Sequence, residues 1–236
     1  MFAKENLIPG IFNYCDRWCE RCRLADRCSI YAEEQSLTDE EKDMSNAAFW
    51  QRLGDSIKEA HQMLEAYLKE AGLEDLPEVE PVKPSAQVQA LNEQARAYTT
   101  ATLRWIREEA PLPEGLAGTG ERVQAISEGR SVIAWYATMV SAKIFRALRG
   151  FDYIKARGGT VAVDSSANGS AKVALLCIDR SLGGWHLIQQ YQPWSTDEII
   201  DFQVHLSRLR QGLLSFFPQA DAFVRPGFDE ITEEME

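Results

Sequence analysis

The sequence predicts an all-α fold, an irregular helical bundle preceded by a short cysteine-rich metal-binding segment. Apolar residues recur at helical spacing along most of the chain. Two stretches, 120–149 and 166–191, are apolar almost all round, which is typical of helices that neighbours bury on several sides. The only strand candidate is the short run TVAV at 160–163, and a single strand cannot form a sheet.

The first long helix is predicted at about 38–72. Thr38 and Glu41 match a capping box, and a break is expected near Ser45 and Asn46. Beyond that break the apolar residues recur at helical spacing, namely Phe49, Leu53, Ile57, Leu64 and Leu68. Three prolines within 73–85 then predict a semi-rigid linker.

Further helices are predicted at 85–109, 120–149 and 166–191, with a break at 110–120. A second capping box, Ser195 with Glu198, predicts the start of a last helix that runs to about Ser215. The acidic tail after Pro218 is expected to fray. The chain therefore divides into a cysteine-rich segment, a helical bundle and an acidic tail, at 1–35, 36–217 and 218–236.

The charge balance excludes some classes of partner. The 236 residues include 25 Lys and Arg against 36 Asp and Glu, a formal net charge of −11. A negative field repels phosphate and anionic lipid, so we expect neither general nucleic-acid binding nor membrane binding. We expect no signal peptide, and the sequence contains no apolar run of membrane-spanning length. We therefore expect a cytoplasmic protein, whose thiols stay reduced.

Four of the five cysteines lie within fourteen residues, in the pattern Cys15-x3-Cys19-x2-Cys22-x5-Cys28. If 12–23 is helical, the first three share one face and a turn can bring the fourth over them. Converging thiolates repel one another unless a cation neutralises them, so the spacing predicts one metal centre with these four ligands. Cys177 lies in the apolar run VALLCI and is expected to take no part.

Both an iron–sulfur cluster and zinc accept four cysteine ligands. We favour iron–sulfur slightly, because zinc sites usually pair two separated knuckles whereas iron–sulfur ligands are often closely spaced. Nearby arginines either offset the negative charge of a cluster or form a solvated face. Tyr14 and Trp18 either shield the centre from water or pack into the bundle.

Two resemblances bear on the metal. The first three cysteines have the spacing of the radical-SAM cluster motif, but that family needs a β/α barrel, which the predicted elements do not provide. The run CERCRLADRC resembles the 4Fe–4S loops of Cas4-like nucleases and SPASM domains. The phrase YCDRWCERC, followed by a helical remainder, also resembles a group of bacterial proteins of unknown activity. These resemblances imply a metal cluster and supply no reaction.

The alternative function is an enzyme with an active site between the central helices, around Glu128, Asp179 and His186. If these helices form an antiparallel hairpin, Glu128 falls opposite His186 and Tyr136 opposite Asp179. Carboxylates and histidines that face into a bundle build di-iron sites, but the Glu-x-x-His repeat of such sites is missing. We therefore expect Glu128 and Asp179 to be buried and paired in a structural network.

Basic residues gather at 146–157, where Arg146, Arg149, Lys155 and Arg157 face a single acid, Asp152. Such a segment, expected in a long loop after Gly150, is suited to dock an acidic protein partner or a phosphate group. The favoured function is a metal-binding module for electron transfer or protein interaction, and the sequence does not define a reaction.

Overall fold

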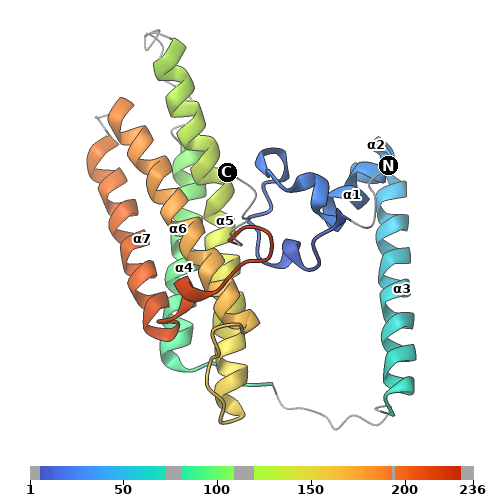
Figure 1. The fold of residues 1–236 in the computed structure, drawn as a ribbon. Helices are drawn as coiled ribbons and strands as arrows, with labels where there is room; N and C mark the ends of the chain where they lie inside the picture. The colour runs from blue at the N-terminus through green and yellow to red at the C-terminus, as the bar shows by residue number, and fades with distance from the viewer. Residues whose placement is uncertain (1–5, 73–80, 109–119, 193–194, 230–236) are drawn as a thin grey trace, which may run out of the picture. The chain divides into compact units, whose positions relative to one another are not determined.

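The computed structural model describes residues 6–72, 81–108, 120–192 and 195–229 (Figure 1). Their regular structure consists of seven α-helices and short 3₁₀ turns without a strand, which confirms the all-α prediction for the described residues. Residues 73–80 of the predicted linker and 109–119, which include nearly all of the predicted break, lie outside them. None of the described helices is both long and apolar enough to cross a membrane.

The chain divides into two compact units: Met1–Ile8 with Cys22–Pro81, and Pro9–Arg21 with Val82–Glu236. These units follow contacts within the folded chain. The predicted segments at 1–35, 36–217 and 218–236 follow composition and motif instead, and they stay a prediction.

The first unit contains three helices: α1 (Ser29–Ser36), α2 (Asp39–Lys42) and α3 (Ala47–Glu70). The capping box on α2 is confirmed, because the Glu41 N–H donates to Thr38 Oγ1 over 3.3 Å and the Thr38 N–H donates to Glu41 Oε2 over 2.9 Å. The predicted break before α3 is also present, and Asn46 caps the new helix by accepting the N–H of Ala48 over 3.0 Å. The short α1 adds to the elements that the sequence predicts.

The second unit is a bundle whose helices lie side by side in Figure 1: α4 (Ala86–Glu108), α5 (Gly120–Ala156), α6 (Ser166–Tyr191) and α7 (Thr196–Phe216). The helices predicted at 85–109 and 166–191 are confirmed almost to the residue. α5 runs past its predicted end at 149, since Phe151 and Ile154 continue its apolar face and pack against the core.

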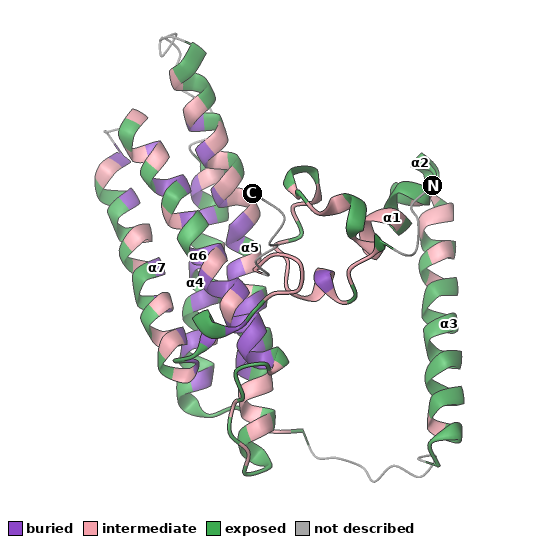
Figure 2. Cartoon of the chain, in the orientation of Figure 1, coloured by how far each residue is buried: buried purple, intermediate pink, exposed green. Residues whose placement is uncertain are grey.

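α5 and α6 form the predicted antiparallel hairpin. A Cβ added to Gly129 would lie 3.0 Å from the carbonyl oxygen of Gly184, and one added to Gly150 would lie 2.7 Å from the Cβ of Ala167. Small residues at both ends therefore let the two helix backbones approach closely. These two helices hold more buried residues than the other described helices, as predicted, and Figure 2 shows the buried residues gathered in the bundle.

The prediction of a second capping box, Ser195 with Glu198, is wrong. Ser195 precedes α7 but its side chain accepts no capping hydrogen bond. The Glu198 carboxylate accepts instead from Trp105 Nε1 on α4 over 3.1 Å. Glu198 therefore bonds to a residue of another helix and not to the residue that caps its own helix.

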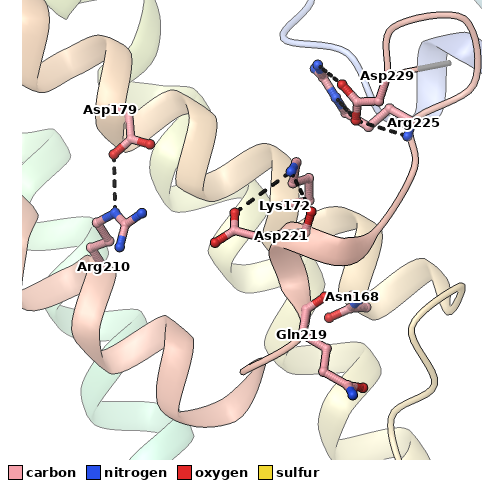
Figure 3. Close-up of polar contacts among 8 residues, drawn as sticks. All are labelled: Asn168, Lys172, Asp179, Arg210, Gln219, Asp221, Arg225 and Asp229. Atoms are coloured by element: carbon pink, nitrogen blue, oxygen red, sulfur yellow. Dashed lines mark hydrogen bonds and ion pairs between the residues drawn. The ribbon is translucent and has the colours of Figure 1, made fainter. Parts of the chain in front are cut away.

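The acidic tail does not fray where it is described. Two of its apolar residues, Ala220 and Phe223, are buried. α6 holds its backbone, because Asn168 Nδ2 donates to the Gln219 carbonyl over 3.1 Å and Lys172 Nζ donates to the Asp221 carbonyl over 2.8 Å (Figure 3). The prediction of fraying is therefore wrong for 218–229, and 230–236 lie outside the described residues.

Candidate metal centre

The cysteine-rich segment folds into short turns and not into the helix considered at 12–23. One 3₁₀ turn forms at each of Ile11–Asn13, Cys19–Arg21 and Ala25–Arg27. Arg17 has a φ of 60°, a left-handed conformation that interrupts any right-handed helix. Cys15, Cys19 and Cys22 therefore do not share a helical face, and the prediction that they do is wrong.

The four clustered cysteines differ from the fifth in burial. All four are half-buried, whereas Cys177 is fully buried. The Cys15 thiol donates to the Phe12 carbonyl over 3.4 Å, and the Cys28 carbonyl accepts the N–H of Ala32 in the first turn of α1 over 3.0 Å. Within the described residues, no group of three or more Cys, His, Asp or Glu side chains is arranged to hold a metal ion. The four-cysteine centre therefore stays a prediction.

Asp16 attaches the segment 9–21 to the bundle. Its carboxylate forms an ion pair with Arg180 on α6 and accepts the Tyr136 hydroxyl of α5 over 2.6 Å. Its carbonyl oxygen accepts Trp135 Nε1 over 2.9 Å, and Arg180 also donates to the Tyr136 hydroxyl over 2.5 Å. Burial and then the adjacent carboxylate raise the pKa of Tyr136, so the phenol stays a protonated donor.

Trp18 is stacked between the bundle and Arg21. Its ring lies on that of Trp135, with centroids 5.1 Å apart and planes at 21°, and the Arg21 guanidinium lies 3.9 Å above it. Arg21 in turn forms a two-point ion pair with Glu128 on α5, and its hydrogen bonds lower the pKa of Glu128. Of the two roles considered for Trp18, packing on the bundle is the one observed.

Tyr14 meets Phe223 of the C-terminal tail above Gly169 on α6. The two ring centroids lie 4.7 Å apart. A Cβ added to Gly169 would lie 2.5 Å from Tyr14 Cε1 and 2.6 Å from Phe223 Cζ, so only glycine leaves room for both rings. Both the segment 9–21 and the tail therefore pack on α6 at Gly169.

Lys143 is a buried cation next to the same segment. Its ammonium donates to the Asn13 carbonyl over 3.4 Å. Burial lowers the pKa of Lys143. Burial raises the pKa of Cys177 to about 12, so this cysteine is a thiol of the core at neutral pH.

The three residues of the alternative enzyme site each contact a different partner. Glu128 pairs with Arg21, Asp179 pairs with Arg210 over 3.3 Å (Figure 3), and His186 is exposed and contacts a glutamine of its own helix. The carboxylate side chains of Glu128 and Asp179 are 45% and 50% exposed. The expected pairing is confirmed, and the expected burial is wrong.

The basic segment 146–157 lies mostly on the last turns of α5 and not in a loop. Its four basic side chains are all exposed. The Arg157 guanidinium lies 3.5 Å from the centroid of the Tyr153 ring, and that of Arg149 lies 6.0 Å from the Phe145 ring. The segment therefore presents cations beside exposed aromatic rings.

The sequence does not predict that Asp16, Tyr136 and Arg180 attach the segment 9–21 to the bundle. The weak signal available was the expected α5–α6 register, which placed Tyr136 within one residue of its observed partner on α6. Comparison with family models, characterised proteins and solved structures gave no match for this chain.

Proposed function

We propose that Cys15, Cys19, Cys22 and Cys28 bind one metal centre, an iron–sulfur cluster ahead of zinc, in a module for electron transfer or protein interaction. A contrast among the cysteines carries this proposal. Cys177 packs in the hydrophobic core, whereas the other four are half-buried and absent from that core. Thiols that recur at ligand spacing outside the hydrophobic core are best explained by metal ligation.

The attachment of the segment 9–21 supports the proposal. Asp16 and Trp18 lie between Cys15 and Cys19, and both are held against α5 by hydrogen bonds and ring stacking. Ligands whose neighbours are already fixed lose less chain entropy when a metal binds. The contacts therefore favour a preorganised pair of thiolate ligands.

The two metals predict different chemistry. An iron–sulfur cluster would make the anaerobic protein brown, bleach in air and respond to a reductant. Zinc would leave the protein colourless and indifferent to a reductant, which would favour a structural or interaction role. With either metal, affinity should fall as the pH falls, because thiolate ligands must lose their protons to bind.

The direct test is metal content per chain after anaerobic purification. Changing any one of the four clustered cysteines to Ser should lower the content of iron or zinc. Cys177→Ala is the matched control and should leave it unchanged, because that thiol lies in the core. A wild-type chain that retains no metal, or an equal loss in Cys177→Ala, would contradict the proposal.

We also propose that the basic segment 146–157 docks an acidic protein partner. The exposed cations on this part of α5 support the idea in a chain whose net charge is −11. A polyglutamate peptide should bind the wild-type chain at low salt and bind Arg146→Glu/Arg149→Glu at least tenfold more weakly. Arg107→Glu, on exposed α4 surface, is the control; equal weakening in it would contradict a specific docking site.

A further inference from the structure

The helix α3 presents an apolar face to solvent. No residue of α3 is buried, although the helix is 24 residues long and fully described. Its large apolar side chains are strongly exposed, with Trp50 at 60%, Ile57 at 61%, Leu64 at 55% and Tyr67 at 63%. A soluble chain rarely leaves such a stripe without a partner.

The stripe follows a seven-residue repeat. Trp50, Ile57 and Leu64 are seven positions apart, and a second row begins three positions later. That second row consists of Leu53, Ala60 and Tyr67. Two such rows are the a and d positions of a coiled-coil seam, which packs against another helix with the same repeat.

We propose that α3 pairs in antiparallel fashion with α3 of a second copy of this chain. An antiparallel pair brings each residue of one row opposite a residue of the other row. Centred between Lys58 and Glu59, the pairing sets Trp50 opposite Tyr67, Leu53 opposite Leu64, and Ile57 opposite Ala60. Both copies then contribute the same surface, as a two-fold contact requires.

The exposed area is large enough for such a pair. Five seam residues, Trp50, Leu53, Ile57, Leu64 and Tyr67, are exposed by 37% or more, and Met63 beside the seam is exposed by 67%. Covering them in both copies would bury on the order of 1,200 Å², the lower end of the range for specific interfaces. The stripe therefore meets the size requirement without help from other helices.

The charges of α3 favour a second copy over a membrane surface. The helix carries three basic and four acidic residues, none of them at the six seam positions. Two copies of α3 therefore repel each other only weakly. A helix that binds an anionic bilayer needs an excess of Lys and Arg on its polar face, which α3 lacks.

Sedimentation equilibrium of the full chain in a thiol reductant tests the proposal. The wild-type protein should show twice its chain mass of 26.6 kDa at micromolar concentrations and above. Ile57→Glu should be monomeric with unchanged far-ultraviolet circular dichroism, because Ile57 is exposed in the single chain. Leu64→Gln should weaken association at least tenfold, and Gln62→Glu, outside the seam, should still dimerise.

The register has its own test. Ile57→Glu/Ala60→Lys should dimerise again, because each glutamate then faces a lysine of the other copy. A wild-type chain that stays monomeric up to about 100 μM, far above the dissociation constants of typical specific complexes, would overturn the proposal. A dimer that survives Ile57→Glu would overturn it too, as would binding to phosphatidylserine vesicles in place of self-association.

Discussion

A few residues with distant partners attach the segment 9–21 to the bundle. Asp16 gathers Tyr136 and Arg180 around one carboxylate, and Gly169 makes room for Tyr14 beside Phe223. Each of these contacts is close and specific. The structure therefore predicts that small changes here have measurable effects.

Gly169→Ala should lower the free energy of unfolding. The new methyl carbon would lie 2.5 Å from a Tyr14 ring carbon, so the aromatic rings or the helix must move. Overpacking of this kind costs about 1–3 kcal/mol. Urea unfolding monitored by circular dichroism measures the loss.

Gly183→Ala is the matched control on the same helix. Nothing lies within 4 Å of a Cβ at that position. Alanine should therefore stabilise the helix by about 0.5–1 kcal/mol through its higher helix propensity. If both alanine variants were stabilised alike, the packing of Tyr14 and Phe223 on α6 would be contradicted.

Roles set by neighbours in sequence could be predicted, and roles set by distant partners could not. The Thr38 cap depends on Glu41, three residues away, and was predicted. Asp16 depends on partners more than a hundred residues away, and in the sequence it looks like the other charged residues around the cysteines. Glu198 was assigned to a local cap because nothing in the sequence signals that Trp105 competes for it.

Among the helices, α6 makes more contacts with other parts of the chain than any pattern in the sequence predicts. It pairs with α5 and holds both the segment 9–21 and the tail. Within the tail, Arg225 donates three hydrogen bonds to the Asp229 carboxylate, two from its guanidinium over 2.9 and 2.7 Å and one from its backbone N–H over 3.1 Å (Figure 3). This ion pair makes part of the stability depend on pH.

Hydrogen bonds from Arg225 lower the pKa of Asp229 in the folded chain. The stabilisation is therefore complete above the ordinary aspartate value of about 3.9 and is lost as the pH falls through the lowered pKa. Asp229→Asn should lose about 1 kcal/mol of unfolding free energy at pH 7. Urea unfolding at pH 7 and at about pH 2.5, below the ordinary aspartate pKa, should show this difference shrinking in acid. A difference that does not change with pH would contradict the ion pair.

The main helices could be predicted because their buried apolar residues recur at helical spacing in the sequence. α4 and α6 each bury a regular set of apolar residues, and their ends match the prediction closely. The turns at 11–27 have no such period. Contacts with α5 and α6 hold Asp16 and Trp18 in place, and no pattern local to the segment encodes those contacts.

In the molecule as a whole, the residues that form the hydrophobic core are not the residues that we propose to bind a metal or a second copy. The described core comes from the helices α4 to α7 and the residues that pack on them. The four clustered cysteines and the apolar stripe of α3 contribute nothing to that core. Residues that a chain keeps half-buried or exposed against their chemical preference point to ligands and partners.

The sequence predicts which residues belong to the candidate site, because the spacing of the four cysteines is typical of metal ligands. It does not predict how their side chains are arranged in space. Their arrangement around a metal depends on the metal itself, because the cation removes the repulsion between thiolates and binding is coupled to local folding. The helical face imagined for Cys15, Cys19 and Cys22 was wrong because Arg17 turns the chain between the first two.

X-ray absorption at the iron and zinc edges of the anaerobically purified chain identifies the atoms that bind the metal. We expect one centre per chain whose protein ligands are all sulfur, at about 2.3 Å from the metal. Iron should also show sulfide bridges to neighbouring iron atoms. A chain without metal, or a metal bound mainly by nitrogen and oxygen, would contradict the assignment of the four cysteines as ligands.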